Sequence, residues 1–597
     1  MDGKKSRNAP PMGHQANYRD FNDPAFSHPR QKRKSTKLGF KIYPTKERNL
    51  HVMVLFAGER LCFYGASMVQ CIAGECNIDG YDMKSSSFDV DKMTLVCCPH
   101  RVGKPLIFEA LTNNEISVNY KHNRLKYRLK EITVLYENIM KDIGSKQPSV
   151  LVLSSKLPAA VECIHNLNET LLLPFVARQF SELEYGWFFE DSSWKLYADE
   201  CAKEIARSIE HLNNKRLEGK RCSVIACAEK GAGKSTFLRH FANRNLKPEF
   251  PPVYYLDSDV GQTECNPSGC LSLYKLTEPL LSVPWAHQKP SFSNCLFLGN
   301  LSPAEDIEKY LNAFEILLNE FSSKSEPGSL LIINTMGWIK GKGEEILNHI
   351  LERARPDLAV LLPSNSGFFK VPSFVPKVIT VRPIHVPNSY VAEVIRNQHR
   401  YERAMKGREL RELSMIAYFA SLLPRSVLSC FNEVLPYIVP FRDLIFAIPE
   451  DLSKFKDEDF FATINVQIVA LCAPVNEDKL VTRHLLEREY LPSIYLVSSN
   501  SPAMRCLGFG FVRGVDLINR KLYICSPLSP EEMNKVTVLA RGEGITVPHD
   551  FLSSQVQLKV PYLSMRSSGS GNNLVNDLYK PLQQRQGYKR AYFPCVE

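Results

Sequence analysis

The sequence predicts an α/β core, a parallel sheet with helices on both faces, flanked by a β-rich N-terminal and a β-rich C-terminal domain. Residues 221–423 alternate short apolar runs with amphipathic helical stretches, the pattern of a parallel sheet covered by helices. Residues 38–151 and 424–563 instead contain short apolar runs bounded by Gly, Asn, Asp, Pro or Ser, which is typical of strands joined by turns. We expect the first of these regions to be β-sandwich-like.

The remaining segments complete the predicted organisation. Residues 1–37 are rich in Asn, Pro, Arg, Lys and Ser, so we expect a disordered basic tail. Its cluster Arg30–Lys34 is typical of a nuclear import signal or a nucleic-acid contact, and a merely solvated tail is the alternative. We expect residues 152–220 to form a helical connection. The last stretch, 564–597, is rich in Ser, Gly and Asn at its start and is expected to be a flexible tail.

The composition is that of a globular protein with more than one domain. The chain has 597 residues, enough for two to four domains, and a globular balance of 44% hydrophobic and 23% charged residues. Apolar runs stay shorter than the roughly 18 to 20 residues of a membrane-spanning helix, and the N-terminus lacks the apolar core of a signal peptide. We therefore expect no membrane partner. The net charge of +10 is compatible with a nucleic-acid partner but does not require one.

The 17 cysteines are scattered and often have apolar neighbours. Without a C-x-x-C pair, the usual zinc-ribbon and thioredoxin interpretations lose their sequence support. Free Cys is among the most buried residue types, and proteins inside cells rarely form disulfides. We expect mostly buried free thiols.

The strongest chemical signal is a phosphate-binding loop. An apolar run, 223–227, precedes AEKGAGKST at Ala228–Thr236, and a helical pattern follows to Asn245. Strand, glycine-bearing loop, Lys-Ser and helix in this order make a P-loop. Its glycines let backbone N–H groups curl around phosphates, and the helix N-terminus adds partial positive charge. The predicted nucleotide-binding residues are Glu229, Lys230, Gly231, Ala232, Gly233, Lys234, Ser235 and Thr236.

This loop predicts ATP and Mg²⁺ as cofactors. Lys234 is expected to neutralise the β- and γ-phosphates, and the Ser235 hydroxyl to complete the Mg²⁺ shell. Ala228 stands where a P-loop usually has its first glycine. Because alanine restricts φ, we expect a slightly adjusted loop. A chance occurrence of the motif is the alternative.

Two carboxylates end the next apolar run. Asp257 and Asp259 follow Val253–Leu256, and ligands of such folds bind beyond the carboxyl ends of the strands. One carboxylate can hold Mg²⁺ through water, and one can take a proton from an attacking hydroxyl. The alternative is that a carboxylate only caps the following turn. The sequence favours this alternative more for Asp257 than for Asp259.

A third apolar run, 329–334, leads into Thr335, Gly337 and Trp338. The tryptophan could stack on a nucleobase, worth roughly 1–3 kcal/mol per base, or could be a core residue beneath the next helix. Residue chemistry alone does not separate the two.

Residues 396–423 are a candidate lid. Its second half is an ordinary amphipathic helix, whereas its first half is strongly basic. Arginines delivered by a mobile segment can stabilise the charge of a transferring phosphoryl group, and a solvated basic face is the alternative. The basic residues are Arg396, Arg400, Arg403, Lys406, Arg408 and Arg411.

Together, GKST, DSDVGQTECNPSGCLSL and INTMGW resemble the polynucleotide 5′-hydroxyl kinases of RNA processing. The D-V-G-Q-T-E and N-T-M-G-W segments, and GFGFVRGVD at Gly508–Asp516, are closer to the nucleolar branch than to the branch of messenger-RNA cleavage and transfer-RNA splicing. The resemblance is clear over residues 220–425, moderate over 505–565 and weak in the N-terminal domain. It implies a P-loop kinase core flanked by two smaller domains.

The resemblance also implies roles for individual residues. Lys234, Ser235 and Thr236 match the ATP and Mg²⁺ residues. Asp259 and Gln262 match a motif at the metal and the attacking 5′-hydroxyl. Thr335 and Trp338 match the clasp that holds the RNA end, and the catalytic lid arginines correspond to Arg408 and Arg411.

The nucleolar branch implies a nuclear, nucleolar enzyme that works with an endoribonuclease. That nuclease cuts the second internal transcribed spacer of pre-ribosomal RNA and leaves a 5′-hydroxyl end for the kinase. The alternatives are the messenger-RNA 3′-end cleavage and transfer-RNA splicing branch, a P-loop ATPase of another class, and a scaffold that binds without turnover. A helicase normally carries a second RecA-like module, and a single P-loop motif is found here.

Overall fold

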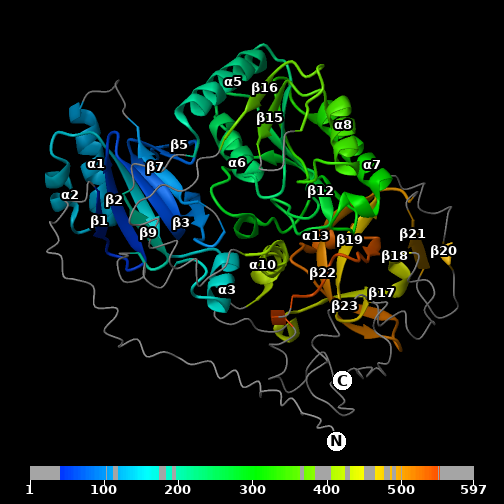
Figure 1. The fold of residues 1–597 in the computed structure, drawn as a ribbon. Helices are drawn as coiled ribbons and strands as arrows, with labels where there is room; N and C mark the ends of the chain where they lie inside the picture. The colour runs from blue at the N-terminus through cyan, green and yellow to red at the C-terminus, as the bar shows by residue number, and fades with distance from the viewer. Residues whose placement is uncertain are drawn as a thin grey trace, which may run out of the picture. The chain divides into compact units, whose positions relative to one another are not determined.

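The computed structural model divides the chain into residues 1–39 and 40–597. The described helices and strands all lie in the second unit (Figure 1). The predicted tails, 1–37 and 564–597, and the first half of the predicted lid lie outside the described residues. The structure describes residues 40–102, 104–111, 118–173, 183–190, 196–363, 369–382, 405–423, 431–449, 464–475, 485–486, 493–498, 501–548 and 550–551.

An N-terminal sheet of nine strands, in the order β1-β2-β8-β3-β7-β4-β5, is built around one long strand, β3, which also pairs with β6 and β9. Its pairings are antiparallel. Helices α1 (Val118–Ile132) and α2 (Tyr136–Ile143) pack against one face. The strands are β1 (Lys41–Pro44), β2 (Leu50–Phe56), β3 (Arg60–Ala73), β4 (Glu75–Ile78), β5 (Tyr81–Lys84), β6 (Thr94–Cys98), β7 (Leu106–Ala110), β8 (Pro148–Ser154) and β9 (Gly186–Phe189).

The N-terminal sheet corrects one predicted boundary. The expected division at residue 151 falls inside β8, which pairs with both β2 and β3. Strand β9 lies in the segment that we expected to be a helical connection, yet it pairs with β3. Both strands are far from β3 in the sequence, and pairing of distant segments leaves no signal in local composition.

The central sheet has parallel strands in the order β16-β15-β10-β14-β11, as the alternating pattern predicts. Antiparallel strands β12 and β13 extend it beyond β11. The strands are β10 (Cys222–Ala228), β11 (Val253–Asp257), β12 (Cys270–Leu276), β13 (Cys295–Phe297), β14 (Leu330–Asn334), β15 (Leu358–Leu362) and β16 (Val378–Thr380).

Helices cover both faces of this sheet because its strands are apolar on both sides. Along β10, Val224 and Ala226 pack in the cluster that contains α5 (Asp199–Leu217) and α6 (Lys234–Asn245). The alternate residues, Ile225 and Cys227, pack in the cluster of α7 (Ile307–Lys324) and α8 (Lys342–Ala354). The predicted fold class is confirmed. Among the described helices, none combines the length and the apolar character of a membrane span.

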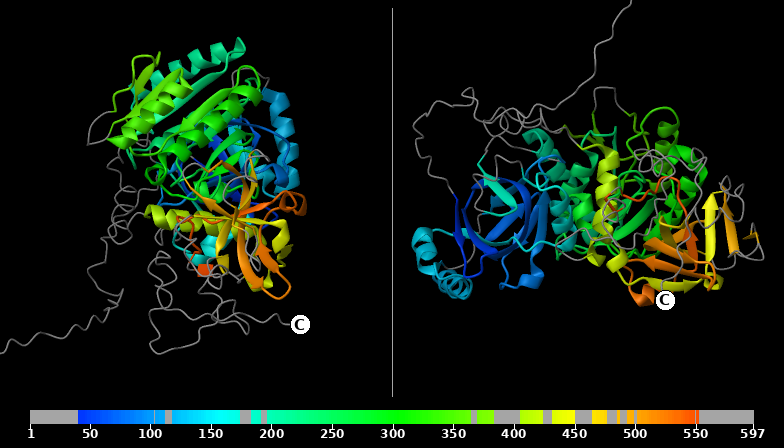
Figure 2. Two further views of the ribbon diagram at one scale, coloured as in Figure 1. Left: turned by 90° about the vertical axis from the view of Figure 1, so that its right-hand side faces the viewer. Right: turned by 90° about the horizontal axis from the view of Figure 1, so that it is seen from below.

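The C-terminal strands, yellow to orange in Figure 2, continue the central sheet instead of starting a separate one. The junction is narrow: β13 pairs with β22 through Leu296↔Arg505 and Phe297↔Met504. The strands are β17 (Tyr437–Pro440), β18 (Ile445–Pro449), β19 (Ile468–Pro474), β20 (Leu485–Leu486), β21 (Ser493–Val497), β22 (Met504–Asp516), β23 (Lys521–Cys525) and β24 (Val538–Ala540).

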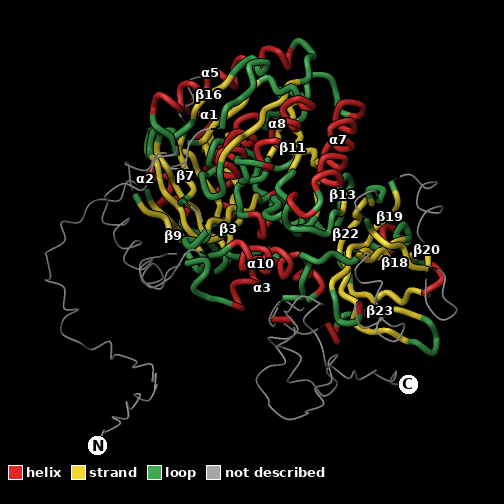
Figure 3. Tube along the Cα trace, turned by 45° about the vertical axis from the view of Figure 1, so that its right-hand side comes forward, coloured by secondary structure: helices red, strands yellow, loops and turns green. Residues whose placement is uncertain are grey.

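Helix α10 (Gly407–Phe419) is the described part of the predicted lid. Its second half is buried with α3 (Ala159–Leu167) and the short helix η3 (Pro284–His287). Figure 3 shows α10 running beside α3. Because this apolar half is anchored, the first turn of α10 is held in a defined place.

Candidate active site

Three predicted motifs meet at one edge of the central sheet. Strands β10, β14 and β11 are parallel neighbours, so their carboxyl ends lie side by side. The P-loop follows β10, the two aspartates end β11 or follow it, and Thr335–Trp338 follow β14. The Lys230 N–H donates to the Gly337 carbonyl at 3.1 Å. A Cβ at Gly337 would lie 2.7 Å from Lys230 N, so glycine is needed for this approach.

The loop has the conformation that phosphate binding requires. Gly231 and Gly233 have φ of +80° and +93°, in the left-handed region that favours glycine. Helix α6 begins at Lys234, and its first N–H groups have no partner within the helix. Ala228 is the buried last residue of β10 and has no positive φ. The expected adjustment of the loop is therefore unnecessary, since an extended strand residue accepts alanine.

Lys234 and Asp259 face one another across this edge. The Lys234 side chain is buried, and its Nζ lies 3.8 Å from Asp259 Oδ2. The other oxygen, Asp259 Oδ1, accepts from the N–H groups of Gly261 and Gln262 at 3.2 and 3.1 Å. These two bonds fix the carboxylate and leave Oδ2 directed at the lysine. A cation and an oriented carboxylate are thus available beside the loop.

The Asp257 carboxylate stabilises the turn after β11 and does not face the open edge of the sheet. It is fully buried, with Oδ2 accepting from the Glu264 N–H at 2.6 Å and Oδ1 from the Asn334 amide at 2.8 Å. Burial, reinforced by the neighbouring Asp259 carboxylate, raises the pKa of Asp257 to about 7 against the opposing effect of these hydrogen bonds. Of the two predicted alternatives, Asp257 takes the structural one.

The site also rests on a buried charge network that sequence reasoning missed. Glu264 Oε1 lies 3.4 Å from Arg239 Nε on α6 and 3.1 Å from His287 Nε2 on η3. Burial alone would raise the pKa of Glu264, but Arg239 and then His287 outweigh it and hold this pKa below its usual value. Glu264 lies within the D-V-G-Q-T-E motif, yet only the fold brings its partners to it.

Replacing Glu264 with glutamine is expected to lower the free energy of unfolding by roughly 3 to 5 kcal/mol at pH 7, because it leaves the Arg239 charge buried without its carboxylate. A carboxyl with a lowered pKa stabilises the fold above its unfolded pKa and loses that effect as pH falls through the folded pKa. The part of the difference that comes from Arg239 should therefore be fully present above about pH 5 and shrink below about pH 4.

Denaturant unfolding across this pH range measures the difference. Glu278→Gln is the matched control, because the Glu278 side chain is 77% exposed and its pair with Lys289 is long, at 3.7 Å. It should change stability by less than about 0.5 kcal/mol. Equal stabilities for the two variants at pH 7 would show that the network carries no net stabilisation.

Thr335 and Trp338 both follow β14 at this edge, but the Thr335 side chain points into the fold. Thr335 is fully buried, and its hydroxyl donates to the Ala226 carbonyl at 2.8 Å, so its side chain is not presented to a substrate here. Trp338 is half-buried beside the α7 and α8 cluster. A Cβ at Gly343, at the start of α8, would lie 2.4 Å from Trp338 Cγ, which places the indole directly on this helix.

The first turn of α10 lies over the P-loop. A Cβ at Gly407 would lie 2.7 Å from Gln262 Nε2, 3.6 Å from Arg411 Nη1 and 3.7 Å from Lys230 Nζ. Burial and then Arg408 lower the pKa of Arg411, while Glu412 and Asp259 oppose that shift. Arg411 is therefore within electrostatic reach of the carboxylate that faces Lys234. Arg408 is mostly exposed and donates to Glu412 at 3.1 Å.

The arrangement brings together what phosphoryl transfer needs. Backbone N–H groups and Lys234 can hold phosphates, Asp259 can orient a hydroxyl, and Arg411 can offset developing charge. The Ser235 hydroxyl and the Asp259 carboxylate are hard oxygen donors of the kind that Mg²⁺ prefers, so the residues present fit that cation.

Three family models match the chain. They are "mRNA cleavage and polyadenylation factor CLP1 P-loop" over residues 228–421, "NOL9-like, C-terminal domain" over 492–547, and "Polynucleotide 5′-hydroxyl-kinase NOL9, N-terminal domain" over 40–182. The first covers the loop, both aspartates and all of α10. The N-terminal match extends past residue 151, in agreement with the position of β8.

Relatives match over most of their length. Polynucleotide 5′-hydroxyl-kinase nol-9 of Caenorhabditis elegans is 33% identical over 551 residues, which cover 92% of this chain and 98% of the relative. Polynucleotide 5′-hydroxyl-kinase NOL9 of Danio rerio is 26% identical over 577 residues, covering 88% and 76%. The solved wild-type Clp1p–Pcf11p complex aligns with a TM-score of 0.46 and 14% identity, over 83% of this chain and 98% of that chain.

Proposed function

This chain belongs to the NOL9 family of polynucleotide 5′-hydroxyl-kinases, and on that premise we propose that it transfers the γ-phosphoryl group of ATP to the 5′-hydroxyl of an RNA end. The observation that carries this proposal is the meeting of Lys234 and Asp259, 3.8 Å apart, at the P-loop edge. A cation for the phosphates and a carboxylate for the acceptor are both held there.

The residues divide the reaction between them. The loop and Lys234 hold the triphosphate, and Asp259 orients the 5′-hydroxyl and accepts its proton as the new bond forms. Arg411 offsets charge on the transferring group, and Gln262 lies at the same opening. Ser235 and Asp259 would hold Mg²⁺, which would neutralise part of the phosphate charge. Catalysis of this type consists mainly of positioning and charge stabilisation.

A transfer assay tests the proposal. The full chain is incubated with γ-labelled ATP or GTP and with 5′-hydroxyl RNA or DNA oligonucleotides of one sequence. Label should appear on the RNA end and should be absent when the oligonucleotide already carries a 5′-phosphate. Release of labelled inorganic phosphate without label on any oligonucleotide would identify a P-loop ATPase of another class.

The finer proposal places the enzyme in the nucleus and nucleolus, where it acts on 5′-hydroxyl ends that an endoribonuclease leaves in the second internal transcribed spacer. The NOL9 assignment of the N- and C-terminal models and the net charge of +10 support it. Depletion should cause spacer fragments with unphosphorylated 5′ ends to accumulate. If unphosphorylated transfer-RNA exons accumulate instead, the chain acts in the transfer-RNA splicing branch.

The two lid arginines should differ in effect. Arg411→Ala is expected to lower kcat about a hundredfold, because Arg411 is half-buried beside Gly407 and within electrostatic reach of Asp259. Arg408→Ala should lower it less than about threefold, since Arg408 is exposed and pairs with Glu412. Steady-state kinetics measure both variants. A larger loss in Arg408→Ala would mean that α10 moves substantially when substrate binds.

Trp338 can be tested through its neighbour. In Gly343→Ala, the new Cβ would lie 2.4 Å from both Trp338 Cγ and the Trp338 carbonyl oxygen, so it would displace the indole together with its backbone. If the indole stacks on the terminal nucleotide, KM for RNA should rise roughly tenfold, while KM for ATP stays unchanged. Glu344→Ala, at the exposed next position, is the control. An unchanged KM for RNA in both Gly343→Ala and Trp338→Ala would assign the indole to packing alone.

A further inference from the structure

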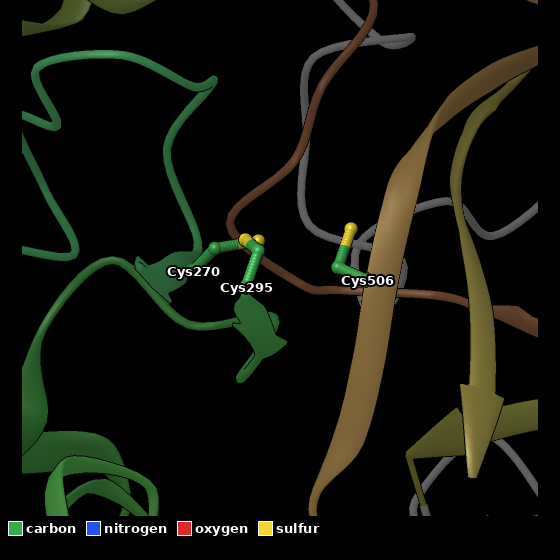
Figure 4. Close-up of side chains that lie close together, drawn as sticks. All are labelled: Cys270, Cys295 and Cys506. Atoms are coloured by element: carbon green, nitrogen blue, oxygen red, sulfur yellow. The ribbon is translucent and has the colours of Figure 1, made fainter. Parts of the chain in front are cut away.

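Four buried cysteines meet where the central strands join the C-terminal strands. The Sγ atoms of Cys270 on β12, Cys295 on β13 and Cys506 on β22 all lie within 4.8 Å of one another. Cys472 on β19 is the direct cross-strand partner of Cys506, and their thiols are close enough to interact. Figure 4 shows the sulfur atoms of Cys270 and Cys295 close together, with Cys506 beside them on another strand.

The cluster is a feature of the sheet and not of one loop. Strands β12, β13, β22 and β19 are consecutive neighbours in the sheet. All four cysteines have 0% exposed surface and belong to the same apolar cluster, so they lie on one side of the sheet. A single buried free thiol is an ordinary small core residue. Four thiols converging from four adjacent strands form a ligand set, which the spacing of the cysteines in the sequence does not reveal.

We propose that these four cysteines bind one soft divalent cation of the zinc class as a structural tetrathiolate site. Thiolates select such metals over Mg²⁺, and four sulfur ligands without an open position are typical of structural sites. Zn–S bonds of about 2.3 Å place tetrahedral sulfur atoms about 3.8 Å apart. The thiols of Cys270, Cys295 and Cys506, which lie within 4.8 Å of one another, reach that spacing by small side-chain rotations, and the Cys472 thiol joins them from beside Cys506. Each thiol loses its proton to solvent as the metal binds.

Two neighbouring cations suit a site with this charge. Four thiolates around a divalent ion carry a net charge of −2. Lys309 is buried, donates to the Leu298 carbonyl at 3.2 Å, and interacts electrostatically with Asp306 and, to a smaller extent, with Cys472. Among the described residues, no carboxylate lies within ion-pair distance of its Nζ. Arg505, which is also paired with Glu320, interacts electrostatically with Cys295. A buried lysine is stabilised by a nearby negative charge, which the tetrathiolate would provide.

The position of the cluster suggests what the metal does. Cys270 and Cys295 belong to the central strands, whereas Cys472 and Cys506 belong to the C-terminal strands. Backbone pairing between β13 and β22 is limited to two residue pairs. A metal bound by all four cysteines cross-links the two parts at this narrow junction, away from the P-loop. Its loss should loosen the junction before it affects the nucleotide site.

Metal analysis of the full-length chain, purified without a metal-binding tag, tests the site. We expect one zinc per chain that survives dialysis, and zinc-edge X-ray absorption should show four sulfur ligands at about 2.3 Å. Cys506→Ser and Cys295→Ser should each lose the metal and lower Tm. Cys525→Ser is the matched control. Cys525 is equally buried on β23 but is not one of the four clustered cysteines, and its Sγ lies 4.0 Å from the Phe431 carbonyl.

Several outcomes would overturn the proposal. They are a folded wild-type chain without stoichiometric metal, nitrogen or oxygen ligands in the X-ray absorption spectrum, or full metal content in Cys506→Ser. A wild-type mass lower by two hydrogens per cysteine pair would indicate disulfides instead. Because the wild-type measurements do not depend on any variant folding, the site is tested even if a serine variant fails to fold.

Discussion

Replacing Lys234 with alanine is expected to lower the rate of phosphoryl transfer by about a thousandfold or more, which corresponds to about 4 kcal/mol of transition-state stabilisation. The Lys234 side chain is buried beside the loop, and its Nζ faces Asp259. In the complex with ATP, this ammonium is the group positioned to neutralise charge on the β- and γ-phosphates. Single-turnover transfer to 5′-hydroxyl RNA at saturating ATP measures the loss.

The chain supplies a matched control at the other edge of the sheet. Lys215 Nζ lies 3.0 Å from Asp357 Oδ1, and Asp357 also accepts from the Ser223 N–H near the start of β10. Lys215→Ala therefore removes a lysine of a Lys–Asp pair without touching the P-loop, and transfer should remain within about twofold of wild type. Unfolding of both variants separates catalysis from stability. A Lys234→Ala protein that is folded and retains full transfer would remove this residue from the mechanism.

The meeting of the three motifs could be predicted from the sequence because each step is local. A glycine-bearing loop follows one apolar strand, carboxylates end a second, and Trp338 follows a third. The carboxyl ends of parallel strands lie at one edge, so the three motifs had to converge. The fold class followed from the same alternation. The role of Asp257 was left open, because burial at the strand end depends on Glu264 and Asn334, which the strand pattern does not place.

Contacts between distant segments could not be predicted. Arg239 and His287 reach Glu264 from different elements, and Gly407 meets Gln262 and Lys230 only because α10 is anchored on α3 and η3. The predicted boundary of the N-terminal sheet was wrong for the same reason, since β8 and β9 pair with β3, which lies much earlier in the sequence. Side-chain direction at a strand end is equally non-local: the Thr335 hydroxyl could face solvent or, as observed, the Ala226 carbonyl.

Asp259→Asn should separate the chemistry of the carboxylate from its place in the fold. The replacement amide keeps an oxygen that can accept from the Gly261 and Gln262 N–H groups, so the turn after β11 should persist. What is lost is the negative charge that faces Lys234 and would accept the proton of the 5′-hydroxyl. Transfer should fall by roughly 10² to 10⁴, the range typical of a general base.

For Asp259→Asn, ATP binding and transfer assays should show an intact nucleotide site and slow phosphoryl transfer. ATP binding in the absence of RNA and of Mg²⁺ should change little, because the loop glycines, Lys234 and the α6 N-terminus remain. Asp357→Asn is the control, since Asp357 also pairs with a lysine and accepts from a backbone N–H but lies at the opposite edge. It should lower stability without slowing transfer. If Asp259→Asn transfers phosphate at the wild-type rate, the acceptor hydroxyl must be activated elsewhere, and the Lys234–Asp259 pair would be a structural ion pair.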